Sequence, residues 1–240
     1  MALRLIWKGP FQPPSSQLPV ASNFAGFSSR RAALQRYVTP LGIPLSRLAR
    51  RIASLSMTSP LPLDSVFQTV LDVPNKTPSP DLPRRLTGLF RELALPEPTR
   101  PVEDIEDQIW ALWGSHEDRL AEETLMAAVE AIGSGSLKAA RPLLDHLVGK
   151  HPDWAEAWNK RATLASIEKR DADSLLDIDR TLQLEPRHFG AIAGFGNICL
   201  RNGHLNEARA AFQIALSINP HMDDLRDMLE NLSPHHLMLH

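Results

Sequence analysis

The sequence has a single cysteine, Cys199, and no run of 18 or more consecutive apolar residues. One cysteine excludes an intramolecular disulfide and any metal site built from several cysteines. Without a long apolar run, we expect no membrane-spanning helix. The 240 residues are 43% hydrophobic and 22% charged, which fits one soluble domain with an appended segment.

Acidic residues are missing from the first 63 positions, which carry eight basic residues. Beyond Leu63 the balance reverses to 18 basic against 28 acidic residues, a net charge of −10. An acidic folded part argues against nucleic acid as its main partner.

Segment 1–60 combines Arg, Ser and Pro with this lack of acids, which is the composition of an organelle transit peptide. It has no apolar stretch of the kind that a secretory signal requires. We therefore predict a disordered, basic targeting segment that directs the chain to an organelle matrix, mitochondrial in preference to plastid. Two alternatives stay open. The segment is an unstructured tail, or it precedes a true start at Met57 and the protein belongs to a bacterial cytoplasm.

Three helices are predicted in region 61–120 from apolar residues at helical spacing and from prolines at the ends of each run. They begin at Asp64, at Asp81 and near Pro101. We expect this region to form an N-terminal helical cap over the exposed face of the first unit that follows it. Trp110 and Trp113 are interpreted as packing residues rather than ligand contacts.

The remainder of the chain is repetitive. Pro152, Pro186 and Pro220 are spaced 34 residues apart, and each follows a run with helical spacing. That period is typical of solenoids built from helical pairs. Small residues recur at the same offset, as close helix crossings require, and so do large apolar ones; the three columns are Ala128, Ala162 and Gly196, then Ala140, Ser174 and Ala208, then Leu144, Ile178 and Phe212.

These columns resemble the tetratricopeptide repeat (TPR) family, and two short segments are also similar to small bacterial TPR proteins of unassigned function. The resemblance covers about 100 of the 240 residues, and Pro142 inside an expected helix departs from it. It implies an all-α, right-handed solenoid of about three helical pairs within 121–232. The expected parts are repeats 121–154, 155–188 and 189–222, a capping helix 223–232 and a tail 233–240.

The resemblance also implies where a partner binds. In TPR proteins the first helix of each pair lines a concave groove, whose positions here are Leu125, Val129, Asn159, Lys160, Thr163 and Asn197. The expected function is a protein-binding scaffold or assembly factor that captures a peptide or helix of a protein partner there. The alternative is a structural subunit docked in a larger complex through its convex face.

One specific TPR activity is not expected. Clamping the carboxylates of chaperone tails needs two lysines, an arginine and two asparagines at set groove positions. Those positions hold Leu125, Val129, Lys160, Gly190 and Gly194, of which only Lys160 is basic.

No catalytic residue, cofactor or metal site is predicted. The sequence has no Gly-rich phosphate loop, nucleophile elbow or His-Glu metal pattern. Asp177 and Asp179 are two residues apart on a helix and do not face each other. His188 is expected to cap the next helix or to bridge two repeats, and Cys199 to be a buried apolar residue. The three histidines of tail 233–240 are interpreted as part of a disordered end.

Overall fold

The computed structural model of the chain describes residues 62–80 and 82–232. The predicted targeting segment 1–60 and the tail 233–240 lie outside the described residues. Within the described ranges the chain forms ten α-helices and one short 3-10 helix, with no β-strand.

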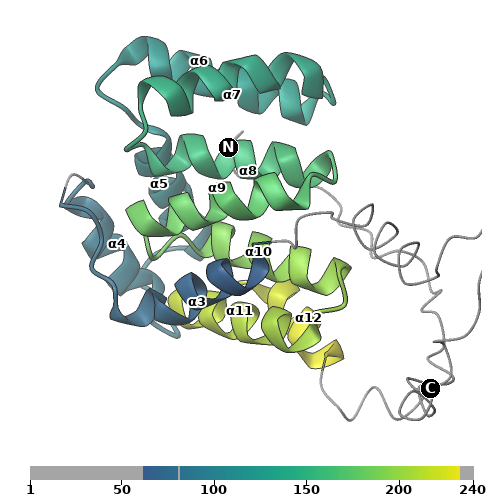
Figure 1. Ribbon diagram of the computed structural model, residues 1–240. Helices are drawn as coiled ribbons and strands as arrows, with labels where there is room; N and C mark the ends of the chain where they lie inside the picture. Colours follow the sequence, from purple (N-terminus) through teal and green to yellow (C-terminus); the bar gives the residue numbers. More distant parts are fainter. Residues whose placement is uncertain (1–61, 81, 233–240) are drawn as a thin grey trace, which may run out of the picture. The chain divides into compact units, whose positions relative to one another are not determined.

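Six of the helices form three consecutive antiparallel pairs that stack in chain order (Figure 1). This is the predicted all-α solenoid of TPR-like helical pairs. The pairs are α6 (Arg119–Gly133) with α7 (Leu137–Lys150), α8 (Ala155–Ile167) with α9 (Asp171–Leu184), and α10 (Phe189–Arg201) with α11 (Leu205–Ile218).

The turn inside each pair has the same geometry three times over. One residue adopts a left-handed conformation, with φ of 76° at Gly135, 60° at Lys169 and 82° at Gly203. Glycine adopts this conformation without steric strain because it has no Cβ atom, whereas the Cβ of Lys169 makes the conformation less favourable. The next amide then returns to a carbonyl five residues earlier, as in a Schellman cap; the bonds are Ser136 N to Ala131 O (2.7 Å), Arg170 N to Ala165 O (2.8 Å) and His204 N to Cys199 O (2.9 Å).

The two columns of small residues lie where the paired helices cross, and all six members are buried. The third pair shows why the side chains must be small. A Cβ added at Gly196 would lie 2.3 Å from the Phe212 ring, closer than carbon atoms approach. The pattern of small and large residues that predicted the pairs thus follows from close helix packing.

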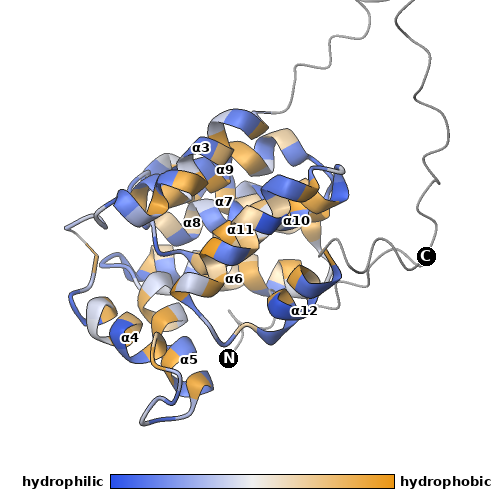
Figure 2. Ribbon diagram, turned by 90° about the horizontal axis from the view of Figure 1, so that it is seen from below, coloured by the Kyte–Doolittle hydropathy of each residue, from blue (hydrophilic) through white to orange (hydrophobic). Residues whose placement is uncertain are grey.

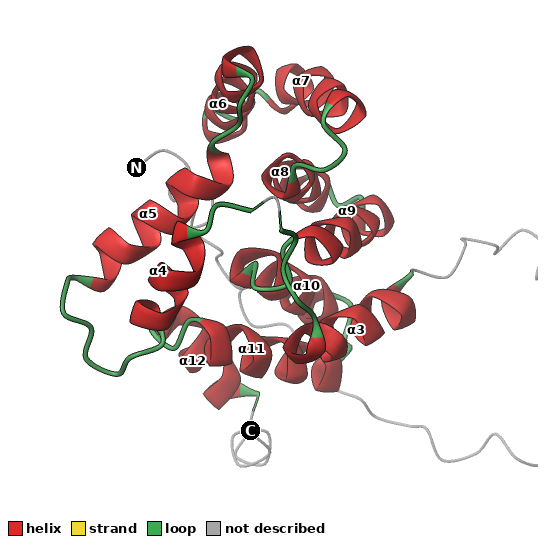
Figure 3. Ribbon diagram, turned by 90° about the vertical axis from the view of Figure 1, so that its left-hand side faces the viewer, coloured by secondary structure: helices red, strands yellow, loops and turns green. Residues whose placement is uncertain are grey.

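The remaining helices are α3 (Leu63–Asp72) with the 3-10 turn η2 (Val73–Asn75), α4 (Arg85–Leu93), α5 (Val102–Gly114) and α12 (Asp223–Asn231). Helix α12 packs against α11. Helix α3 packs against α9 and α11, while α5 packs against α8 on the other side of the stack (Figure 3).

The sequence predicted that region 61–120 covers the exposed face of the first repeat. This prediction is wrong. The region encloses the second and third repeats instead, and Leu120 on α6 remains 69% exposed. The physical reason is that α3, α4 and α5 bury their apolar residues in the same core cluster as α9, α10 and α11, whereas α6 and α7 form a separate cluster with α8.

Helix α3 fills the outer side of the stack between two second helices. The rings of Phe67 and Phe195 stack with centroids 6.1 Å apart, and Thr69 Oγ1 donates to Asp179 Oδ1 over 2.6 Å. Val66 and Val70 are buried beneath it. This part of the convex surface is thus covered by the chain itself.

Apolar residues concentrate on the sides of the helices that face their neighbours, with polar residues turned outward (Figure 2). The longest described helix, α6, has 15 residues, whereas a bilayer core needs about 20. In the described ranges, no helix qualifies as a membrane span.

Candidate functional site

The candidate binding surface is the inner face of the stack, formed by the first helices of the three pairs, α6, α8 and α10. The 34-residue period places equivalent residues side by side on these helices. Much of this face is not open, because α5 packs against α8 (Figure 3) and its Trp110 ring contacts Phe189 and Gly190 at the beginning of α10.

Two tryptophans hold α5 in this position. The Trp110 ring fits against Gly190, where an added Cβ would lie 2.8 Å from Trp110 Cη2. The Lys160 ammonium lies 4.9 Å from the centroid of the same indole ring, within cation–π range. Trp113 stacks on the His188 imidazole with centroids 4.1 Å apart and planes 9° from parallel. The prediction that Trp110 and Trp113 are packing residues is confirmed.

Beneath α5 lies a fully buried polar cluster centred on Glu156. Its Oε1 is 2.9 Å from Lys160 Nζ, an ion pair rather than an aligned hydrogen bond. Its Oε2 accepts from Asn159 Nδ2 at 3.1 Å and lies 2.9 Å from His188 Nε2. The carboxylate thus joins the second repeat to the beginning of the third.

His188 bonds at both ring nitrogens. Its Nδ1 accepts from the backbone N–H of Ala191 at 3.1 Å, which caps the first turn of α10. An accepting Nδ1 carries no proton, so Nε2–H is the donor to Glu156. The prediction that His188 caps the next helix or bridges two repeats is confirmed, since it does both.

Opposing effects act on the Glu156 carboxyl. Burial raises its pKa, but the Lys160 ammonium and the His188 hydrogen bond together lower it more, so that the pKa lies below its ordinary value of 4.5. Glu156 is therefore a buried carboxylate whose charge is balanced by Lys160. Such a pair is strongly destabilised when one partner is removed.

The six residues predicted to line the groove fall into two groups. Leu125, Val129, Asn159 and Lys160 are buried, with 3% of Asn159 and 1% of Lys160 exposed. The arrangement leaves these four no surface on which to touch a partner. Thr163 and Asn197 are only partly covered. They occupy the same position of successive repeats, on the part of α8 and α10 that lies beyond α5.

The uncovered part of the inner face combines amide, hydroxyl and apolar groups. Asn197 is partly covered, and its Oδ1 atom is buried and has no hydrogen-bond partner within the described residues. Thr163 Oγ1 donates to Asn159 O over 2.9 Å within its own helix. Ile167 on α8 and Met126 on α6 are 44% and 42% exposed. An extended peptide needs both kinds of contact, polar for its backbone and apolar for its side chains.

Sequence reasoning missed that α5 covers the groove. A hydrogen bond from Trp154 Nε1 to Trp113 O, 2.8 Å long, and the Trp110 contact with Gly190 both join residues at least 41 positions apart. The spacing of apolar residues shows which side of a helix is apolar, but it does not show which distant helix packs against that side. One available signal was Gly190, a glycine inside a helix where no turn requires it.

Catalytic and metal-binding candidates are dispersed. Asp177 binds Arg161, Asp179 accepts from Thr69, and His188 faces Glu156. Among residues 62–80 and 82–232, no three His, Cys, Asp or Glu side chains are placed to hold a metal ion together. Cys199 is fully buried, as expected.

Comparison with known proteins adds a relative in bacteria. No family model matches the chain. A curated TPR repeat-containing protein of Rhizobium etli is 30% identical over 169 residues, which span 70% of this chain and 82% of that protein.

Proposed function

The chain belongs to the family of TPR repeat-containing proteins, and from this membership we propose that it is a protein-binding scaffold whose partner segment occupies the uncovered part of the inner face. Family membership supports a role in protein interaction generally. The finer proposal is carried by one observation. Asn197, which is only partly covered and occupies the position of Thr163 in the next repeat, has a buried amide oxygen without a hydrogen-bond partner within the described residues.

An unpaired amide favours a partner with free backbone groups. A buried acceptor without a donor costs about 1–3 kcal/mol. Asn197 Oδ1 makes no hydrogen bond within the described residues. Rotating the Asn197 side chain so that this buried oxygen faces a ligand therefore breaks no hydrogen bond of that oxygen there. A peptide N–H and C=O can then pair with the two ends of the Asn197 amide, while Ile167 and Met126 receive apolar side chains.

The partner segment binds without displacing α5. If α5 left the inner face, it would expose four apolar side chains that are each at most 4% exposed in the folded chain; these are Ile105, Ile109, Trp110 and Trp113. At about 1.5–3 kcal/mol for each side chain, this costs roughly 6–12 kcal/mol. That range is comparable to the roughly 8 kcal/mol of an entire micromolar complex. The α5 helix is thus treated as a permanent wall of the site.

The proposed partner is not a chaperone tail. The one basic residue at the corresponding positions, Lys160, is buried and paired with Glu156. No carboxylate can reach its ammonium without separating that pair and lifting α5. The partner is also not expected to be nucleic acid, because the chain beyond Leu63 carries a net charge of −10.

The alternative function, docking through the convex face, has less support. Helix α3 already occupies the outer side of α9 and α11. No described feature of the outer surface of α7 favours such docking over the inner face.

The inner face can be tested with paired variants. Thr163→Arg with Asn197→Arg fills the uncovered surface, while Gln213→Arg places the same group on the exposed side of α11. Proximity labelling with each full chain in its native compartment should recover a partner with the wild type and with Gln213→Arg, but not with the double variant. Equal recovery by all three would show that the partner binds elsewhere.

Import into an organelle, mitochondrial in preference to plastid, remains a proposal that rests on the acid-free, arginine-rich composition of residues 1–63. A fluorescent reporter fused behind these residues should accumulate in the organelle. Diffuse cytosolic fluorescence would contradict import and favour one of the two alternatives, a plain tail or a start at Met57.

A further inference from the structure

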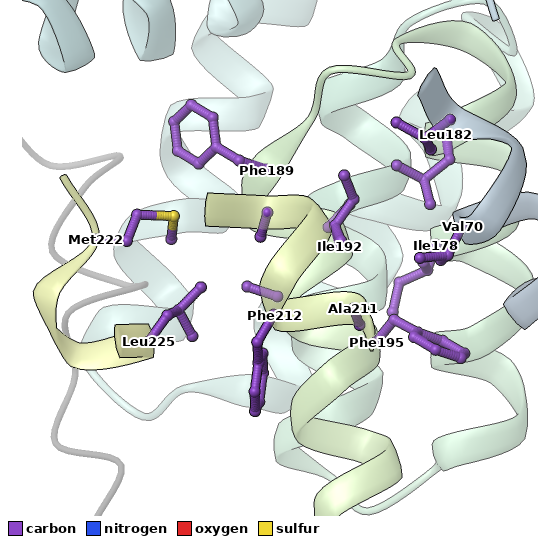
Figure 4. Packing of buried hydrophobic residues seen from close by; sticks show 14 of the residues in the cluster. Val70, Ile178, Leu182, Phe189, Ile192, Phe195, Ala211, Phe212, Met222 and Leu225 are labelled. Carbon is purple, nitrogen blue, oxygen red and sulfur yellow. The ribbon is translucent and has the colours of Figure 1, made fainter. Parts of the chain in front are cut away.

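The linker 115–118 carries the chain from one hydrophobic core to another. The larger core, part of which Figure 4 shows, contains apolar residues of α5 together with those of the second and third repeats. The smaller core belongs to α6, α7 and part of α8. The linker therefore joins the wall of the inner face to the first repeat, and the proposed function does not depend on it.

Two histidines meet at this linker. The rings of His116 and His151 lie edge to face with centroids 4.3 Å apart, and the His116 ring is also 4.7 Å from the Trp154 ring. His116 belongs to the linker, whereas His151 lies in the turn between α7 and α8. Both residues are partly covered. The ring contact places the linker against the boundary between the first and second repeats.

His116 makes a hydrogen bond that only its neutral form can make. Its Nδ1 accepts from the backbone N–H of Asp118 at 3.0 Å. An accepting ring nitrogen carries no proton, so the proton of the neutral ring is on Nε2. With a second proton on Nδ1, two donors would face each other and the bond would be lost. Uptake of a proton therefore requires the ring to turn away from the Asp118 amide.

The charged groups around the two rings attract that proton. Asp118 Oδ2 lies 3.7 Å from His151 Nε2, which is an ion pair when His151 is protonated. From the first turn of α6, Glu122 Oε1 accepts the backbone N–H of His116 at 2.7 Å. Nearby carboxylates favour an imidazolium, whereas a charge on one imidazole disfavours a charge on the other. The third neighbour, the Trp154 ring, carries no charge.

We propose that His116 is a pH-sensitive switch of the linker 115–118. The neutral ring bonds the Asp118 amide and holds the linker in place. As the pH falls through the range in which imidazoles titrate, about 5 to 8, protonation breaks this bond and the ring leaves His151. Asp118 also caps α6, since its Oδ1 accepts from Leu120 N at 2.9 Å. The first turn of α6 is therefore released together with the linker.

Amide proton exchange in the ¹⁵N-labelled full chain tests this switch. Exchange is measured at pH 5 and pH 8 and corrected for the intrinsic dependence of amide exchange on pH. We expect the protection of the Asp118 amide to be roughly 3- to 10-fold lower at pH 5, the equivalent of one net hydrogen bond, and the protection of Leu120 to fall with it. Equal protection of Asp118 at the two pH values would overturn the proposal.

Matched variants identify the group that takes up the proton. His116→Asn keeps an acceptor for the Asp118 amide, because an asparagine side chain bonds the backbone two residues on, and it does not titrate. It should retain at pH 5 the protection that it has at pH 8. His146→Asn, at an exposed position of α7, should respond to pH as the wild type does. A wild-type response in His116→Asn, or its loss in His146→Asn, would assign the proton to another group and contradict the switch.

Discussion

Burial determines the chemistry of Cys199. Its side chain is fully covered, and burial, with a contribution from the Glu207 carboxylate, raises the pKa of the thiol to about 12. Only the thiolate is a nucleophile, so at neutral pH this cysteine acts as a small apolar residue.

We expect Cys199 to resist Ellman's reagent at pH 8 in the native protein and to react fully in 6 M guanidinium chloride. Spectrophotometric titration of the released thiolate measures both. Stoichiometric reaction of the folded chain within minutes would mean that the thiol is accessible.

Gly190 lies where the Trp110 ring of α5 packs against α10. Gly190→Ala places a methyl group 2.8 Å from Trp110 Cη2, inside the core. We expect it to lower the free energy of unfolding by about 1–3 kcal/mol, since overpacking forces the indole ring to move. Urea denaturation followed by circular dichroism measures the change.

Gly149→Ala is the matched control, because an added Cβ there meets nothing within 4 Å and the residue lies inside α7. Replacing a helical glycine by alanine should instead stabilise the protein by roughly 0.5–1 kcal/mol. If both variants shift stability in the same direction, α5 does not pack on Gly190 in solution.

Glu156 makes the protein sensitive to acid. Its pKa is below the ordinary 4.5 in the folded chain and returns to that value on unfolding. Between the two values the unfolded state binds more protons, so stability is complete above about pH 4.5 and falls as the pH drops through the lower, folded pKa.

Glu156→Gln should remove this part of the acid dependence. It should also cost about 3–5 kcal/mol at pH 7, because the Lys160 ammonium is left buried without its counter-charge. Thermal unfolding between pH 3 and pH 8 checks both effects. Glu123→Gln, at an exposed pair with Arg119, is the control, and an equal loss in the two variants would exclude a special role for Glu156.

At the scale of elements, α3 joins two second helices that are not consecutive in the chain. Val70 on its inner side is fully buried, while Gln68 is exposed. Val70→Ala should destabilise the protein by roughly 1–3 kcal/mol through the cavity it leaves, and Gln68→Ala by less than about 0.5 kcal/mol. Differential scanning calorimetry measures both. An unchanged melting temperature in Val70→Ala would mean that α3 is not docked on α9 and α11.

Most helices were predictable, because each carries its own period and its own end signals. The third predicted helix, near Pro101, corresponds to α5, and the second, which begins at Asp81, corresponds to α4 at Arg85. Pro142 is accommodated inside a continuous α7 on its exposed side. Its ring therefore faces solvent, and its cost is limited mainly to the lost backbone hydrogen bond.

The positions at which α3, α4 and α5 pack on the repeats could not be predicted from the sequence. They depend on complementary shapes, such as Trp110 against Gly190 and Phe67 against Phe195, that link residues 80 or more positions apart. The same limit affected the candidate site. Asn159 and Lys160 occupy groove positions by the repeat frame, but that frame does not show what covers them.

At the scale of the whole molecule, the described part of the chain is a solenoid that closes much of its own groove. A repeat-built surface of amide, hydroxyl and apolar groups remains uncovered between α6, α8 and α10. The proposed binding surface depends on α5 lying against the inner face, since α5 bounds that surface.

Lysine footprinting tests this arrangement most directly. Lys160 is 1% exposed beneath Trp110, whereas Lys138, Lys150 and Lys169 are exposed on the same repeats. Native acetylation at pH 7.5, quantified by peptide mass spectrometry, should modify these three lysines rapidly and leave Lys160 at least about tenfold slower, in line with a buried ion pair. Acetylation of Lys160 at the rate of Lys169 would contradict the closed inner face.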